Sequence, residues 1–322
     1  MVVLQEKIPV SVPDVFRGLR WFKPYFDVCR VESWLSWVCG FALGAVSFSS
    51  LLLGQTVAIF FAFSFATASI FVLNQYFDRQ DDGKNKQKSN LPIASGQISP
   101  MNALIFSFLL MSSCFVLVYL VDINLSLPLF VYIALWGLYS APTPKLKSKP
   151  IADFLTSGVG AGFLPFYIGS SIPHQLGVNL PFILLAAAPL VLFQSGAHII
   201  QTIGDFEADR EAGISTFVVR YGRKQGVLIA SLMFLSAFLY PFVCLFAGLV
   251  SPDHVIFLSV LLPLSFPSLL RFRDLYRDPC SGNVDRLQKS VRKYGVIVLI
   301  IAWVYVLFTK NVFVGFPWDR MI

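Results

Sequence analysis

Residues 54–82 read GQTVAIFFAFSFATASIFVLNQYFDRQDD, an apolar run that ends in Asn74, Asp78 and Asp82. The run is long enough to cross a lipid bilayer as a helix, which takes about 20 residues. Residues four apart on an α-helix lie about 6 Å apart along its axis and project from nearly one face. The stretch therefore predicts a membrane helix that carries an amide and two carboxylates in one stripe.

A second polar stripe has the same spacing. Gln201, Asp205 and Asp209 stand at the end of another apolar run. An acidic side chain at the centre of a membrane costs roughly 2.5 to 3.5 kcal/mol, so each stripe either binds cations or belongs to a helix end that has emerged into water. Two matching stripes are better explained as facing halves of one polyvalent cation site than as two unrelated helix ends.

The composition is that of a polytopic membrane protein. Of the 322 residues, 56% are hydrophobic and 13% are charged, which leaves too little polar surface for a soluble globule. Nine apolar runs of suitable length predict an all-α membrane protein with nine transmembrane helices. The predicted spans are 32–52, 54–77, 101–121, 123–139, 151–172, 179–203, 225–249, 254–270 and 291–312.

The distribution of basic residues predicts the orientation. All 25 Lys and Arg residues except Lys310 and Arg320 lie in the N-terminal segment or in the connections on one side of the membrane. The positive-inside rule assigns that side, with the N-terminus and both stripes, to the cytoplasm. The net charge of +7 is then explained by the basic residues that orient the protein in the membrane. No basic patch outside these connections indicates a nucleic-acid partner.

The chain divides into three parts by composition. Residues 1–30 mix charged with aromatic side chains and have no apolar core of a cleavable signal, which predicts a cytoplasmic interfacial segment. Residues 31–313 form the predicted nine-helix domain. Residues 314–322 are then a short tail on the non-cytoplasmic side.

Lysines flank the stripes in the cytoplasmic connections. Lys84, Lys86 and Lys88 follow the first stripe, and Lys145 and Lys147 follow the fourth predicted span after a proline-rich turn. Two divalent cations would neutralise the four stripe carboxylates, and a bound diphosphate would then need cations from the protein. Mg²⁺ suits donors that are all oxygens and commonly bridges carboxylates and phosphates. The alternative is that these lysines only set the topology.

Two further polar residues lie close to the second stripe. His198 falls at helical spacing from Gln201 and Asp205 and extends the polar line deeper into the predicted bilayer. It could orient an acceptor or take up its proton, or it could be satisfied by a neighbouring helix. Asp153 is expected to be the N-cap of the fifth predicted span.

With these residues in view, the chain resembles the UbiA superfamily of intramembrane prenyltransferases. Its Asn74, Asp78 and Asp82 match the NxxxDxxxD motif of that family, and Asp205 with Asp209 match its DxxxD motif. The segment LPIASGQIS at 91–99 is similar to the LPxxSGxIS segment of the family. The segment YSAP at 139–142 is similar to its Tyr-and-Lys segment, but Lys145 lies six residues from Tyr139, which leaves open which lysine contacts phosphate.

The resemblance implies a helical bundle around a central cavity that opens sideways to lipid. It also implies an enzyme that transfers a polyprenyl group from a polyprenyl diphosphate to a lipophilic acceptor and releases diphosphate, with two Mg²⁺ ions in the active site. The metal ligands implied are Asn74, Asp78, Asp82, Asp205 and Asp209, and the spacing of the second stripe adds Gln201 as a candidate. The diphosphate contacts implied are Lys84, Lys86, Lys88, Tyr139, Lys145 and Lys147, and His198 joins the four aspartates as a catalytic candidate.

Three other activities use related features. A terpene cyclase of the same superfamily ionises the same donor without an acceptor, and a cation-coupled transporter could also use facing acidic stripes. CDP-alcohol phosphotransferases are disfavoured because Asp82 stands where their motif has glycine. The sequence does not choose among quinone-precursor, ether-lipid, chlorophyllide, haem and carotenoid acceptors, and it indicates no required protein partner.

Overall fold

The computed structural model describes residues 22–48, 53–85, 88–172, 180–250 and 255–309, and these form helices joined by turns, without a strand. Within the described residues, five helical segments are long and apolar enough to cross a membrane: Gly54–Lys84, Pro100–Val121, Ile123–Ser140, Leu180–Gly204 and Arg223–Phe246. The fold class is therefore all-helical, as predicted. Most of residues 1–30 and the whole tail 314–322 lie outside the described residues.

Helices cover most of the described part of each of the nine predicted spans. This does not test how many of the spans cross a membrane. The long helices are α3 (Leu35–Phe48), α4 (Leu53–Lys84), α5 (Pro100–Val121), α6 (Ser126–Ser140), α9 (Leu180–Gly204), α12 (Arg223–Phe246), α13 (Val255–Arg277) and α14 (Ser281–Thr309). The short elements are α2 (Lys23–Val28), η1 (Val31–Trp34), η2 (Ile123–Leu125), η3 (Leu146–Ser148), α10 (Phe206–Glu211) and α11 (Phe217–Tyr221).

The fifth predicted span is a broken helix. It consists of α7 (Ala152–Ser157), a π-helical turn η4 (Gly158–Phe163) and α8 (Leu164–Ser170). Pro165 has no amide hydrogen, and its ring would clash with the carbonyl four residues earlier in a regular helix. A π turn absorbs such a disturbance, and three glycines within η4 let it lie directly against α9 and Trp136.

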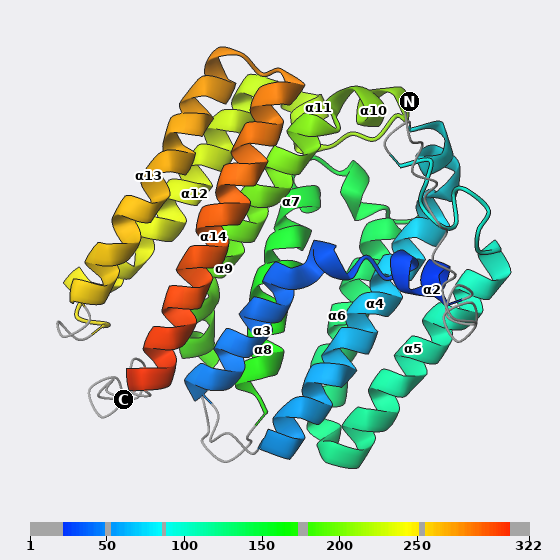
Figure 1. Cartoon of the computed structure of the whole chain (residues 1–322), viewed down its shortest axis with the longest axis horizontal. Helices are drawn as coiled ribbons and strands as arrows, with labels where there is room; N and C mark the ends of the chain where they lie inside the picture. The colour runs from blue at the N-terminus through cyan, green and yellow to red at the C-terminus, as the bar shows by residue number, and fades with distance from the viewer. Residues whose placement is uncertain (1–21, 49–52, 86–87, 173–179, 251–254, 310–322) are drawn as a thin grey trace, which may run out of the picture.

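The two largest apolar clusters of the described residues hold most of the bundle together. One joins α3, α4, α6 and α8, where the Trp37 and Trp136 rings stack with their centroids 4.7 Å apart. The other joins α9, α11, α12, α13 and α14 around Phe234 and Leu287. The two halves meet along α3, η4, α8 and α9, and α10 and α11 lie at one end of the bundle (Figure 1).

Glycines set the distance between α3 and α8. A Cβ atom on Gly169 would lie 2.0 Å from the Phe41 carbonyl oxygen, and one on Gly44 would lie 2.1 Å from that of Phe166. Small residues of this kind permit close helix packing in membranes, where burial of apolar surface supplies little driving force. These contacts hold the broken fifth span against α3.

We expect Gly169→Ala to lower the thermal unfolding midpoint of the detergent-solubilised protein by several degrees, because the added methyl group forces α3 and α8 apart. Gly137→Ala in α6 is the matched control, since nothing lies within 4 Å of a Cβ atom there. Equal midpoints for the two variants would contradict this account of the packing.

Candidate active site

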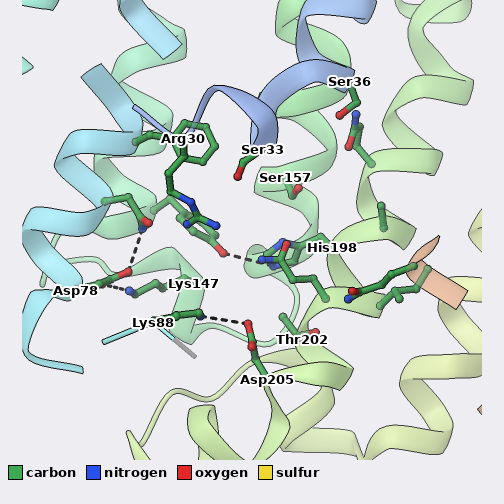
Figure 2. A pocket seen from close by; sticks show the side chains of 18 of the residues that line it. Arg30, Ser33, Ser36, Asp78, Lys88, Lys147, Ser157, His198, Thr202 and Asp205 are labelled. Atoms are coloured by element: carbon green, nitrogen blue, oxygen red, sulfur yellow. Dashed lines mark hydrogen bonds and ion pairs between the residues drawn. The ribbon is translucent and has the colours of Figure 1, made fainter. Parts of the chain in front are cut away.

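The two acidic stripes line one cavity of about 990 Å³. Asn74, Asp78 and Asp82 reach it from α4, while Gln201, Asp205 and Asp209 reach it from α9 and the start of α10. Figure 2 shows Asp78 and Asp205 on opposite sides of the pocket, each next to a lysine. The prediction that the two stripes face each other is therefore consistent with the cavity that they share.

The first stripe lies on one continuous helix, because α4 extends past the predicted end of its span to Lys84. The Asn74 amide donates to Asp78 Oδ2 over 3.0 Å and to Ser140 Oγ over 3.1 Å. The other oxygen of Asp78 forms an ion pair with Lys147, and both side chains are largely buried. Asp82 is buried one turn further along α4.

The second stripe spans the junction of two helices and does not lie on one continuous helix. Helix α9 ends at Gly204, and α10 begins at Phe206 with Asp205 at the junction. Backbone bonds from Asp205 N to Gln201 O and from Asp209 N to Asp205 O, 3.1 and 2.8 Å long, keep the helical spacing across the break. Asp205 and Asp209 thus stay on one side despite the change of helix.

The carboxylates of the two stripes are partly or fully buried, and they repel one another. Burial, together with the negative charge of Asp205, raises the pKa of Asp209 to about 7, although Lys88 and Lys147 act in the opposite direction. Burial by itself would lower the pKa of Lys88, but the charges of Asp205 and Asp82 outweigh it and the pKa is raised. The lysine and carboxylate charges therefore stabilise one another across the cavity.

The structure distinguishes among the predicted lysines. Lys88 pairs with Asp205 over 3.3 Å, Lys147 pairs with Asp78, and Lys84 also lines the cavity. Lys145 does not line it: this residue has a left-handed backbone, with φ of 50°, and precedes the turn η3, which directs Lys147 inward. Lys86 lies outside the described residues.

The donor set suits Mg²⁺ bound jointly by protein and substrate. Among the described residues, no three His, Cys, Asp or Glu side chains lie close enough together to hold one ion. Mg²⁺ commonly takes one or two carboxylates and completes its octahedron with water and substrate phosphates. The first stripe offers two carboxylates, those of Asp78 and Asp82, next to the side-chain amide of Asn74. The second stripe offers those of Asp205 and Asp209, next to the amide of Gln201.

Tyr139 and His198 meet beside the acidic stripes. The Tyr139 hydroxyl lies 3.4 Å from His198 Nε2, and both residues line the cavity. Figure 2 shows His198 pointing into it. The Tyr139 ring also contacts Trp136 edge to face, with centroids 5.2 Å apart. His198 thus has a polar partner on a neighbouring helix and also lines the cavity. A contact with a neighbouring helix and a role toward an acceptor are therefore compatible.

Asp153 has a role other than the expected one. The N-cap of α7 is Ile151, and Asp153 lies in the first turn, fully buried. Its carboxylate accepts hydrogen bonds from the backbone N–H groups of Phe154 and Phe217, the latter over 3.0 Å. Asp153 therefore ties the start of α11 to α7 and holds the segment that follows the second stripe.

Arg30 is a cavity residue that sequence reasoning assigned only to an interfacial segment. It has a left-handed backbone, with φ of 48°, and its guanidinium lies over the Phe71 ring, 5.8 Å from the centroid. The preceding turn is held by Gln75, which donates to the Val28 carbonyl, and by Trp34, which donates to the Cys29 carbonyl. The positive charge of Arg30 interacts with Asp82 of the first stripe and with Asp205 of the second.

Known proteins are similar to this chain over most of its length. The profile of the UbiA prenyltransferase family matches residues 33–282. A digeranylgeranylglyceryl phosphate synthase of Methanobrevibacter smithii is 27% identical over 89% of this chain and 98% of its own length. A lycopene elongase/hydratase of Halobacterium salinarum is 28% identical over 71% and 82%.

The fold has a close counterpart among solved structures. A UbiA homolog from Archaeoglobus fulgidus, bound to GPP and Mg²⁺, superposes with a TM-score of 0.68 at 20% identity and covers 89% of this chain and all of the other. The matched region contains both acidic stripes, His198 and Lys147. The chain belongs to the UbiA prenyltransferase family.

Proposed function

We propose that this protein is a Mg²⁺-dependent prenyltransferase that moves a polyprenyl group from its diphosphate to a lipophilic acceptor within the membrane. The observation that carries the proposal is one cavity in which two carboxylate stripes on different helices meet Lys88 and Lys147. Two opposed acidic pairs with cations beside them fit a metal–diphosphate group, whereas a site for a bare cation would not need the lysines.

The donor headgroup is expected between the stripes. We assign Asp78, Asp82, Asp205 and Asp209 to two Mg²⁺ ions, with the amides of Asn74 and Gln201 as additional donors. When bound, the ions neutralise negative charge that develops on the departing diphosphate. Lys88 and Lys147 would exchange their carboxylate partners for phosphate oxygens, since the ions then neutralise the carboxylates. Arg30 and Lys84 add positive charge at the same end.

The reaction separates charge in a dry cavity. The bond between C1 of the prenyl chain and the diphosphate oxygen breaks, and its electron pair leaves with diphosphate. A nucleophilic atom of the acceptor forms the new bond to C1, and we assign its proton to His198. Aromatic rings of Trp37, Phe71 and Trp136 line the cavity near this point and exclude water that would otherwise capture the allylic cation.

We place the site on the cytoplasmic side of a nine-span domain with its N-terminus in the cytoplasm. Support comes from the basic residues, which gather in the connections next to the acidic stripes. Insertion of protease sites into the connections near residues 88 and 175 tests the orientation, because only the former should be cleaved from the cytoplasmic side.

Diphosphate release tests the proposed function. With geranylgeranyl diphosphate as donor and a panel of lipophilic acceptors, release should require Mg²⁺ and stop after chelation, because unneutralised carboxylates repel the diphosphate. Asp209→Asn should lower release by orders of magnitude, whereas Glu207→Gln, an exposed partner of Arg223, should not. Release with cyclic products and no acceptor adduct would instead indicate a terpene cyclase, and ion flux without release a transporter.

Lys147 and Lys145 provide a test substitution and its matched control for the proposed donor site. Lys147→Gln should raise the apparent KM for the donor about 10- to 150-fold, as loss of a charge-assisted contact worth roughly 1.5 to 3 kcal/mol implies. Lys145→Gln should leave it nearly unchanged, because that side chain does not line the cavity. Similar effects of the two substitutions would show that the lysines act only on topology.

His198 should separate ionisation from transfer. Because diphosphate departure depends on the acidic stripes, His198→Ala should reduce acceptor adduct while diphosphate release continues and prenyl alcohol accumulates. Product analysis by mass spectrometry measures both. A parallel fall of adduct and release would contradict a role of His198 at the acceptor.

A further inference from the structure

Helix α10 carries Asp209 of the second stripe but has little packing of its own. It has six residues, and none of them is buried. A helix shorter than about 12 residues is not stable by itself in water. The Asp209 N–H donates to the Asp205 carbonyl at the junction with α9, over 2.8 Å. The position of the Asp209 carboxylate therefore depends on how the segments on either side of α10 are attached.

The C-terminal end of α10 is closed by a Schellman motif. Gly213 has a left-handed backbone, with φ of 69°, and its N–H donates to a carbonyl in the last turn of α10 over 3.2 Å. The Ile214 N–H donates to the carbonyl of Asp209 itself over 2.8 Å, which is the second bond of this motif. The segment 212–216, which contributes to the cavity lining, is thereby joined directly to Asp209.

Asp153 holds the far end of this segment. Its carboxylate is fully buried and accepts a hydrogen bond over 3.0 Å from the N–H of Phe217, the first residue of α11. It also accepts one from the Phe154 N–H in its own helix, and the Phe154 and Phe217 rings meet edge to face with centroids 5.5 Å apart. Helix starts leave backbone N–H groups without an intrahelical partner. One carboxylate therefore satisfies such groups at the starts of both α7 and α11.

Asp153 is also joined to the opposite side of the cavity. Its backbone N–H donates to the Lys149 carbonyl over 3.0 Å. Lys149 directly follows the turn η3, which contains Lys147, and Lys147 pairs with Asp78 of the first stripe. A buried carboxylate is stable only where hydrogen bonds compensate for its lost hydration. Here those hydrogen bonds link the connection of Lys147 to the segment next to Asp209.

We propose that Asp153 is a positioning residue of the metal site: by holding Phe217, it fixes the segment 212–216 and with it the Asp209 carboxylate. This role rests on the proposed transferase function, because it concerns how tightly the second stripe binds Mg²⁺ together with the donor diphosphate. Asp153 does not line the cavity, so it acts only through Asp209.

Hydrogen exchange of the full-length protein in nanodiscs, without metal or substrate, tests the structural step. In Asp153→Ala, the peptide that covers residues 212–217 should exchange at least about tenfold faster than in the wild type, because the Phe217 N–H loses its acceptor. Asp122→Ala is the matched control, since this carboxylate also caps a short helical turn, η2, and does not line the cavity. Equal exchange of the peptide in the wild type and Asp153→Ala would overturn the proposal.

Metal-dependent binding tests the functional step. The probe is geranylgeranyl thiolodiphosphate, a donor analogue in which sulfur replaces the bridging oxygen and slows diphosphate departure. Asp153→Ala should raise the Mg²⁺ concentration for half-maximal binding about 10- to 100-fold, as is typical of residues that orient metal ligands. Affinity for the analogue at saturating Mg²⁺ should change far less. Asp153→Asn, which keeps one acceptor oxygen, should show a smaller rise.

The possible outcomes separate this role from the proposed function. Uniform loss of binding at every Mg²⁺ concentration, or an equal rise in Asp122→Ala, would show a purely structural role and overturn the proposal. Where Asp153→Ala does not fold, Asp153→Asn carries both measurements. Analogue binding to the wild type that is independent of Mg²⁺ would instead overturn the Mg²⁺-dependent function, and the exchange measurement would still decide whether Asp153 holds the segment.

Discussion

Repulsion among partly buried carboxylates is the constraint on which the rest of this structure depends. Asp78, Asp82, Asp205 and Asp209 share one cavity, and burial together with the charge of Asp205 raises the pKa of Asp209 to about 7. Such a cluster persists only where opposite charge is close. Lys147 and Lys88 provide part of that charge in the protein itself, and the proposed metal ions would provide the remainder.

The scaffold keeps this charged cluster apart from two apolar half-bundles. Stacked aromatic rings fill the half built on α3, α4, α6 and α8, and aliphatic side chains with Phe234 fill the half built on α9, α12, α13 and α14. Short elements close the charged end: the Arg30 turn is held by Gln75, and α11 is held by Asp153. A largely apolar frame is thereby combined with polar connections at the charged end.

The sequence by itself determined the class, the helices and both acidic stripes. These properties are local: an apolar run predicts a membrane helix, and a spacing of four residues predicts one helical face, so Asn74, Asp78 and Asp82 could be grouped without a structure. The break after Gly204 was not predicted, yet backbone bonds across it preserve the spacing of Asp205 and Asp209. The spacing of four residues therefore keeps Asp205 and Asp209 on one side even though the helix is interrupted between α9 and α10.

Only the tertiary structure decided which distant residues complete the site. Lys145 and Lys147 are the same residue type in the same connection, so the sequence does not distinguish them. The left-handed backbone at Lys145 and the turn η3 direct the Lys147 side chain into the cavity, where it pairs with Asp78. Arg30 reaches the stripes because Gln75, far along the chain, fixes its turn. Such relations depend on how remote segments pack, which no local pattern in the chain specifies.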